Sequence, residues 1–366
     1  MNPDPIFETP FKKNAQAASE RIEAFWNRAL LDRPAIIVTA PAAQPREYPK
    51  KTHATHADRW LDIEYAVDWA EAQVRNIYWG GDSLPLTFPN LGPEVIATGY
   101  GCPLEFGEYT TWSVPIITDW DRLEGLKFDR TNFFIETMMK MTRAMLERAR
   151  GRWLVGHTDI HPGGDLAASL RGPQELCIDI AEDPDHVRKL LTKIQPAFEE
   201  FYSMIHDLIR EYGQTMTTTW SPIYARGKFY IPSNDFSCMI SSPKFKELFI
   251  PGLIEEIRFL DRSLYHLDGP QALRHLPLLL DIPELDAVQW VFGSGNGPAA
   301  KWAHVYKQIQ DAGKCVQVVE MTAEDMNPLM DVLNPEGVVF MLSAASPEEA
   351  DALVSRVARW TKAGKY

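Results

Sequence analysis

Two polar residues near the end of an apolar run are the strongest candidates for chemistry in this sequence. In the segment SLYHLDGPQAL, His266 and Asp268 are two residues apart and are followed directly by Gly269 and Pro270. Residues two apart on a strand face the same side, so the imidazole and the carboxylate should face one pocket. Asp268 is therefore a candidate catalytic group. The alternative is structural: Asp268 caps the next helix and His266 fills the core.

The segment GHTDIHPGGD has the same two-residue spacing in His157, Asp159 and His161. Asp159, with an imidazole on either side, is a candidate general acid or base, or an oxygen ligand to a cation. We expect the two histidines to contact the substrate. Gly163 and Gly164 allow the backbone to turn closely above them. The alternative is that this group only ties down a loop.

A third carboxylate, Glu320, ends the apolar run CVQVVE. A carboxylate at the end of a buried strand needs a partner or an altered pKa. We therefore count Glu320, with Asp268 and Asp159, among the candidate catalytic residues.

Aromatic residues stand near these groups, several of them in loop-like segments. Rings can surround a quaternary ammonium by cation–π attraction, or stack on a sugar face; packing in the core is the alternative. The candidates for substrate binding are Trp112, Trp220, Tyr224, Tyr230 and Trp290. The glycine-rich GSGNG at 293–297 lacks the lysine of a P-loop and is more typical of a tight turn.

Alternating strand and helix patterns would position these residues. Strands are expected at 35–40, 76–86, 152–158, 215–221, 263–268, 287–292, 314–321 and 338–343. Eight strands with helices between them predict an α/β fold, a (β/α)8 TIM barrel with N-terminal helices, in one domain covering 1–366. In such barrels the active site lies at the carboxyl ends of the strands, where the candidate residues fall.

Helix signals and two long irregular segments complete this arrangement. Ser346, Pro347 and Glu349 form a capping-box pattern at the start of the last helix, and Ser242–Pro243 opens another helix that Pro251 and Gly252 should bend. Residues 87–130 are rich in Pro, Gly and aromatic residues and too long for an ordinary loop, so we expect a lid or cap insertion. Residues 222–242 form a second long excursion.

Composition excludes several classes of partner. The 366 residues carry 37 Lys and Arg against 50 Asp and Glu, a formal net charge of −13, which argues against nucleic acids and anionic membranes. No apolar stretch reaches membrane-spanning length and the first residues do not resemble a signal peptide, so we expect a cytoplasmic protein. The four cysteines are scattered without a C-x-x-C pair, which is typical of reduced thiols: Cys102, Cys177, Cys238 and Cys315.

The order of these features resembles the uroporphyrinogen decarboxylase superfamily, which includes corrinoid-linked methyltransferases. The resemblance covers most of residues 20–363, at the level of a distant relative. It depends on the helix that begins at Ser242–Pro243 and contains Phe245 and Pro251, on the following strand with His-x-Asp-Gly, on 171–191 and on DRPAIIVTA. It implies a (β/α)8 barrel. Related barrels often pair as homodimers, although no residue here specifies an interface.

The sequence departs from the family at two functional motifs. The N-terminal arginine-rich signature that binds porphyrin carboxylates is replaced by an apolar stretch, which argues against porphyrin decarboxylation. Thiol-activating methyltransferases of the family bind zinc through a His-x-Cys pair and a late cysteine; the matching positions here are His266 and Asp268, and a position near Ser343. The resemblance therefore implies an oxygen-rich site for zinc or another divalent metal, or a metal-free site in which Asp268 orients the substrate.

From this resemblance we expect a methyltransferase that moves a methyl group from a small methylated substrate, such as a methylammonium, to a corrinoid on a partner protein. The first alternative is a glycoside hydrolase with two of Asp159, Asp268 and Glu320 as acid and base, separated by about 5 Å for retention or about 6.5 to 9.5 Å for inversion. The second alternative is a ligand-binding barrel without catalytic activity.

Overall fold

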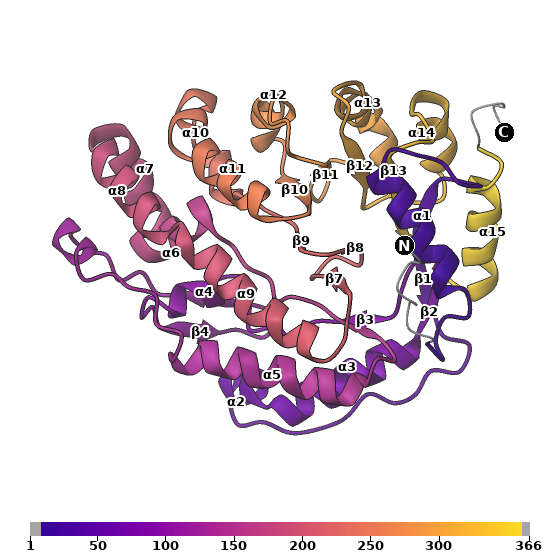
Figure 1. Ribbon diagram of the computed structural model, residues 1–366, viewed down its shortest axis with the longest axis horizontal. Coiled ribbons are helices and arrows are strands. Elements are labelled where there is room, and N and C mark those ends of the chain that lie inside the picture. Colours follow the sequence, from indigo (N-terminus) through magenta and orange to yellow (C-terminus); the bar gives the residue numbers. More distant parts are fainter. Residues whose placement is uncertain (1–8, 361–366) are drawn as a thin grey trace.

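The computed structural model describes residues 9–360 and shows a mixed α/β fold around a curved sheet (Figure 1). Seven strands form this sheet in the order β2-β1-β13-β12-β11-β10-β9, and every neighbouring pair is parallel except β1 and β2. Their bounds are β1 (Ala35–Pro41), β2 (Ile77–Gly81), β9 (Phe229–Tyr230), β10 (Arg262–Asp268), β11 (Ala287–Val291), β12 (Cys315–Val318) and β13 (Val338–Ser343).

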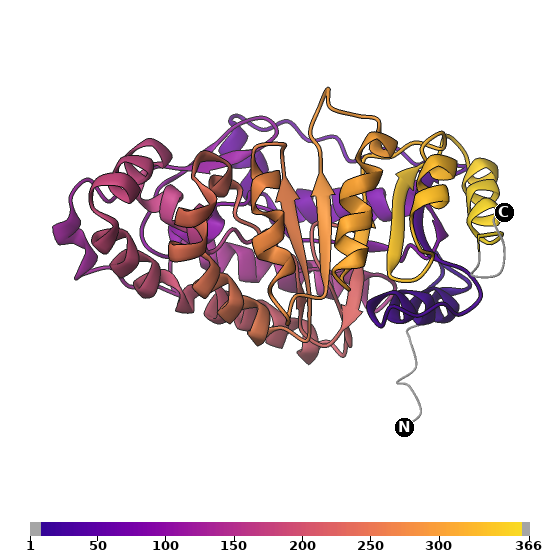
Figure 2. The ribbon, with the colours of Figure 1, turned by 90° about the horizontal axis from the view of Figure 1, so that it is seen from above.

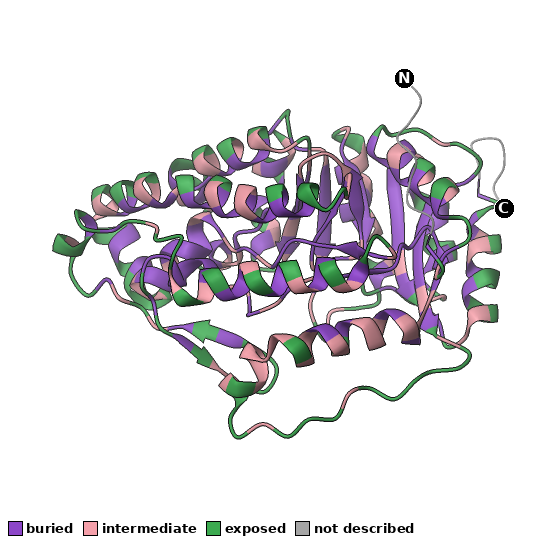
Figure 3. Cartoon of the chain, turned by 60° about the horizontal axis from the view of Figure 1, so that its bottom comes forward, coloured by how far each residue is buried: buried purple, intermediate pink, exposed green. Residues whose placement is uncertain are grey.

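Helices cover the outer side of the parallel strands. Each of the last four strands is followed by one: α12 (Leu276–Leu280), α13 (Ala303–Asp311), α14 (Met326–Val332) and α15 (Pro347–Val357). Figure 2 shows parallel strands with their arrowheads at one edge of the sheet. Figure 3 shows buried residues concentrated in the strands, whereas the helices alternate buried and exposed faces. Strands buried on both faces read as continuous apolar runs, which is why the sequence predicted them well.

The remaining strands are short. The parallel pair β3 (Leu86–Thr87) and β6 (Leu154–Val155) and the antiparallel pair β7 (Met216–Thr218) and β8 (Tyr224–Arg226) form separate two-stranded sheets. The Gln214 side chain accepts a hydrogen bond from Val155 N at 2.9 Å and donates one to Val155 O at 3.0 Å. It thus occupies backbone groups that a neighbouring strand would use.

These pairings refine the predicted barrel. All eight expected strands overlap observed strands, but the expected strand at 76–86 is split into β2 and β3, and β2 runs antiparallel to β1. Within residues 9–360 the hydrogen-bonded strands form one large and three two-stranded sheets rather than one continuous ring. The expected closed ring of eight parallel strands is therefore replaced by one large sheet and smaller strand pairs. At Val155, the side chain of Gln214 takes the place of a strand partner.

The other helices precede β10 in the chain, and two 3-10 turns lie among the later elements. They are α1 (Ala15–Trp26), α2 (His56–Leu61), α3 (Ile63–Asn76), α5 (Phe133–Ala149), α6 (Gly163–Arg171), α7 (Pro173–Glu182), α8 (Pro184–Ile194), α9 (Pro196–Glu211), α10 (Ser242–Leu248) and α11 (Ile250–Phe259), with the 3-10 turn η3 (Ala272–His275) before α12 and η4 (Ala299–Trp302) before α13. The break between α10 and α11 falls at Phe249, close to the bend expected from Pro251. No helix in the described range is long and apolar enough to cross a bilayer.

The two excursions contain regular structure of their own. Residues 87–130 form α4 (Val95–Thr98), the hairpin β4 (Leu104–Phe106) and β5 (Thr111–Ser113), and the turn η1 (Trp120–Leu123). Backbone amides of Ile116 and Ile117 donate to Leu170 O at the end of α6, which attaches this segment to the body of the fold. Its role as a lid stays a prediction. The second excursion contains β8, β9 and η2 (Asp235–Met239).

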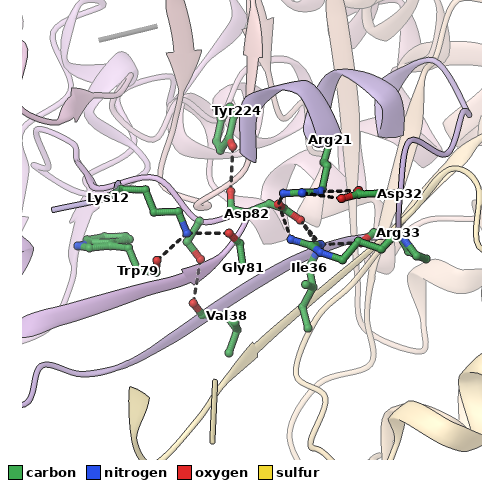
Figure 4. A network of polar contacts seen from close by, with 12 residues as sticks. Lys12, Arg21, Asp32, Arg33, Ile36, Val38, Trp79, Gly81, Asp82 and Tyr224 are labelled. Atoms are coloured by element: carbon green, nitrogen blue, oxygen red, sulfur yellow. Dashed lines mark hydrogen bonds and ion pairs between the residues drawn. The ribbon is translucent and has the colours of Figure 1, made fainter. Parts of the chain in front are cut away.

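A buried ion cluster anchors the N-terminal end of β1 (Figure 4). Asp82 is fully buried; its carboxylate accepts two hydrogen bonds from Arg33 at 2.6 and 2.8 Å, one from Arg21 and one from Ile36 N at 3.0 Å. Nearby, Lys12 Nζ donates to Trp79 O and Gly81 O on β2. The N-terminal segment, α1, β1 and the end of β2 are thereby held together.

Candidate functional site

Strand β10 carries the pair that the sequence singled out. His266 and Asp268 lie on the same face near its carboxyl end, and Gly269 then adopts a φ of 81°, which favours glycine and turns the chain away. His266 N donates to Pro232 O at 2.9 Å, and the Trp220 ring meets the His266 ring edge-on with centroids 5.3 Å apart. The expected pairing of these two residues at a strand end is confirmed.

Two further carboxylates join this pair, and the sequence alone did not single them out. Asp165 is the third residue of α6 and Asp235 is the first residue of η2. The carboxylate of Asp165 accepts hydrogen bonds from Asp235 N at 3.0 Å and Phe236 N at 2.8 Å, so it holds the start of η2. Asp165 belongs to the segment GHTDIHPGGD, whereas Asp235 lies in the second excursion, where no strand end marked it.

These side chains form two overlapping groups that could each hold a metal ion. His161, Asp165 and Asp235 each offer one ligand atom within 4.8 Å of the others, and so do Asp235, His266 and Asp268. Asp235 belongs to both groups. We call the five residues the acidic cluster: His161, Asp165, Asp235, His266 and Asp268.

An unpaired carboxylate oxygen indicates that the acidic cluster could bind a cation. Asp235 Oδ1 is buried and has no hydrogen-bond partner among the described residues. A buried carboxylate oxygen without a partner is costly, and a bound cation would satisfy it. Imidazole nitrogen with carboxylate oxygens suits zinc with bound water or a harder divalent ion.

Burial and neighbouring charges shift the pKa values of the cluster. Burial, with the negative charge of Asp235 nearby, raises the pKa of Asp165 to about 6. Burial also raises the pKa of Asp268, although His266 opposes this shift. Burial alone would lower the pKa of His161, but the carboxylates of Asp159, Asp165 and Asp235 outweigh it and raise the pKa to about 10. In the metal-free protein His161 therefore carries a positive charge among carboxylates at neutral pH, and it would have to lose this proton to bind a metal ion.

The loop 158–161 brings Asp159 beside the cluster. Asp159 Oδ1 lies 3.4 Å from His161 Nε2 as an ion pair. Tyr230 anchors this loop, because its hydroxyl donates to Thr158 O at 3.0 Å and accepts a hydrogen bond from Ile160 N. Tyr230 was expected to bind substrate; the structure gives it a place under the loop that carries Asp159 and His161.

His157 does not reach the acidic cluster. Its ring stacks on Tyr202 of α9 with centroids 4.1 Å apart, and neither ring nitrogen has a hydrogen-bond partner among the described residues. Burial, with a smaller contribution from His206, holds the pKa of His157 well below its ordinary value. The residue is a neutral core histidine packed against a helix, a place that neither the expected substrate contact nor the alternative of a loop anchor described.

The expected aromatic residues are divided between different places. Trp220 alone among the candidate tryptophans contacts the cluster. Trp290 has 0% of its surface exposed and packs on Trp302 of η4, on the helix side of the sheet. Tyr224 donates to Asp82 O at 2.8 Å in the buried ion cluster. Trp112 lines a surface hollow of about 660 Å³ with Arg59.

Glu320 lies in a second hollow at the carboxyl ends of β1, β12 and β13. This hollow has a volume of about 480 Å³, and apolar, hydroxyl and acidic side chains line it, among them Ile37, Thr39, Pro222, Glu320, Met321, Thr322, Met341, Leu342, Ser343 and Glu349. The segment 220–222 connects the acidic cluster with this hollow, because Trp220 contacts His266 and Pro222 lines the hollow. We call this hollow the acidic pocket.

The backbone at Glu320 is strained. Its φ of 52° places a residue with a Cβ in the left-handed region, which costs of order 1–3 kcal/mol and persists where the surroundings impose it. Such strain is typical of functional positions, so the observation favours a role for Glu320.

Comparisons with known proteins give a likeness in fold. No family model and no curated protein matches the sequence. Among solved structures, a methyltransferase from Methanosarcina mazei superimposes with a TM-score of 0.60 over 93% of this chain and 98% of that chain, at 12% sequence identity. At this identity the likeness shows that the two proteins share a fold.

Proposed function

We propose that this chain is a methyltransferase with a (β/α)8-type fold of the uroporphyrinogen decarboxylase kind. It moves a methyl group from a small methylated amine to a corrinoid on a partner protein. The observation that carries the proposal is the acidic cluster, which lies where parallel strands end in a fold shared with a methyltransferase. The carboxyl ends of strands are where such folds place their chemistry.

The acidic cluster is the proposed metal site. Asp235, His266 and Asp268 would hold a divalent cation, which would supply Lewis acidity at the carboxyl end of β10. Asp165 fixes the backbone of η2 and so holds Asp235 in position. Asp159 pairs with His161 at the edge of this site.

The acidic pocket is the proposed place for the methylated amine. Its thioether and aliphatic walls suit methyl groups, and Glu320 suits a positive nitrogen. The sequence predicted an aromatic cage for such a cation; the described residues that line this pocket include no aromatic side chain, and methionine, aliphatic, hydroxyl and carboxylate side chains line it instead. Transfer breaks one C–N bond, and the electron pair of that bond stays on the amine, which leaves. A reduced corrinoid supplies the nucleophile that accepts the methyl group.

An assay with purified protein tests this function. The protein is incubated with cob(I)alamin and each of monomethylamine, dimethylamine, trimethylamine and tetramethylammonium, and the loss of the cob(I)alamin absorbance is followed. We expect at least one donor to react, and Asp268→Asn to lower its rate by about 100-fold or more. Asp207→Asn, an exposed carboxylate on α9, is the matched control. If no donor reacts, or if Asp268→Asn keeps full activity, the proposal fails.

The glycoside hydrolase has less support. Its sugar platforms were expected among the tryptophans, but Trp290 packs on the helix side of the sheet and Trp112 lies in another hollow. Release of a reducing sugar from a panel of glycosides, without any corrinoid, would establish it in place of methyl transfer.

A further inference from the structure

A row of polar side chains crosses the interior face of the sheet beside the acidic cluster. His266 on β10, Gln289 on β11 and Gln317 on β12 are register partners, each directly opposite the next. His266 Nδ1 is hydrogen-bonded to Gln289 Oε1; Gln289 Nε2 donates to Gln317 Oε1 at 2.7 Å; Gln317 Nε2 contacts Met341 Sδ on β13 at 3.5 Å. We call these four residues the amide ladder.

The chemistry of its last member fixes the direction of the amide ladder. A thioether sulfur has no hydrogen and can only accept, so Gln317 must turn its NH₂ group toward Met341. Its carbonyl oxygen then faces Gln289 and requires a donor, which must be the NH₂ group of Gln289. The carbonyl oxygen of Gln289 therefore faces His266 and requires a hydrogen on Nδ1.

Burial makes this direction stable. Gln289 is 2% exposed and Gln317 is 0% exposed, so water does not compete for their amide groups. If either amide turned over, two acceptors or two donors would face each other in the interior and lose their hydrogen bonds.

We propose that Gln289 is a positioning residue that holds neutral His266 as the Nδ1–H tautomer and leaves the lone pair of Nε2 for the acidic cluster. In metal sites the second ring nitrogen of a ligating histidine is commonly held by such a partner, which fixes both the tautomer and the orientation of the ring. Met341 is the residue that sets the direction, although it lies three strands away. The consequence for metal affinity rests on the proposed function, whereas the tautomer itself does not.

Nuclear magnetic resonance of the metal-free protein tests the tautomer directly. The protein is labelled with ¹⁵N in its histidine rings, and His266→Gln assigns the signals of His266. When the ring carries a single proton, we expect the proton of His266 on Nδ1. A wild-type spectrum with the proton on Nε2 would overturn the proposal, and this measurement requires no variant of the ladder.

Two substitutions at Gln289 separate positioning from packing. Gln289→Glu keeps an acceptor for Nδ1–H and should keep the tautomer, while Gln317 turns its NH₂ group toward the new carboxylate. Gln289→Leu removes that acceptor, so we expect a mixture of tautomers and a zinc or cobalt affinity lower by about 10- to 100-fold, measured by competition with a chromophoric chelator. Gln308→Leu on the exposed face of α13 is the matched control.

The outcomes distinguish this proposal from the proposed function. An unchanged tautomer in Gln289→Leu would overturn the role of Gln289, whatever the protein catalyses. The protein could also show the predicted change of tautomer but bind no divalent metal and transfer no methyl group. That result would support the amide ladder and contradict the proposed function.

Discussion

At the scale of single residues, Glu320 combines a strained backbone with a place in the acidic pocket. Glycine adopts a φ of 52° without strain, so Glu320→Gly should raise the free energy of unfolding by about 1 kcal/mol while methyl transfer falls. Urea denaturation and the cob(I)alamin assay measure the two effects. At a functional position, a substitution that relieves strain is expected to stabilise the protein and lower its activity.

Arg150 offers a control for this prediction. Its φ is 47° at the end of α5, far along the chain from the pocket, and its side chain is exposed. Arg150→Gly should give a similar gain in stability with unchanged activity. If both variants lose activity equally, the loss reflects backbone flexibility and not the Glu320 carboxylate.

Glu256 on α11 should give the stability a dependence on pH. It is 4% exposed, and burial, together with the charges of Asp165 and Glu255, raises its pKa to about 8. Since the folded state holds this proton more tightly than the unfolded state, whose pKa is about 4.3, stability falls as the pH rises from about 4.3 to about 8. Glu256→Gln removes this fall, and each pKa unit corresponds to about 1.4 kcal/mol.

The measurement is the free energy of unfolding in urea at several pH values. Glu182→Gln is the control, because Glu182 is an exposed glutamate on α7 that does not contribute to the shift at Glu256. Equal pH slopes in the wild type and Glu256→Gln would show that the buried carboxyl is not the source.

At the scale of elements, α15 is the helix whose start the sequence predicted best. Ser346 accepts a hydrogen bond from Glu349 N at 3.2 Å, and Glu349 accepts one from Ala345 N. Ser346→Ala should therefore cost about 1 kcal/mol in the free energy of unfolding. Ser355→Ala, at an exposed position in the last turn of the same helix, should leave stability nearly unchanged, and an equal cost for both would contradict a capping role.

The elements differ in how far the sequence could predict them. Strands β10 to β13 are long apolar runs between helices, and their bounds fall within a few residues of those expected. The short strands β8 and β9 were not predicted, because two or three residues carry no periodic signal. The antiparallel direction of β2 depends on its pairing with β1, which the local sequence does not encode.

The same distinction applies to the site at the scale of the whole molecule. His266 and Asp268 could be found because one strand carries both at a spacing of two. Asp165 and Asp235 come from a helix start and a 3-10 turn 70 positions apart, and the fold brings them together. Gln289 and Gln317 were not singled out from the sequence, because their side-by-side placement depends on the register of three neighbouring strands.

The buried ion cluster at Asp82 joins parts of the chain that are distant in sequence, so its loss should affect the whole fold. Asp82→Asn keeps the shape but removes the charge that faces Arg33 and Arg21, and an unpaired buried arginine is costly. We expect a loss of about 3–5 kcal/mol in the free energy of unfolding, measured by urea denaturation.

The metal affinity of the acidic cluster should survive in the Asp82→Asn protein that remains folded. The ion cluster binds Ile36 at the N-terminal end of β1. The candidate metal ligands lie elsewhere, near the carboxyl end of β10. Asp32→Asn, which removes only an exposed partner of Arg21, should cost much less stability. If Asp82→Asn weakened metal binding without destabilising the fold, the division into an anchoring end and a reactive end would be wrong.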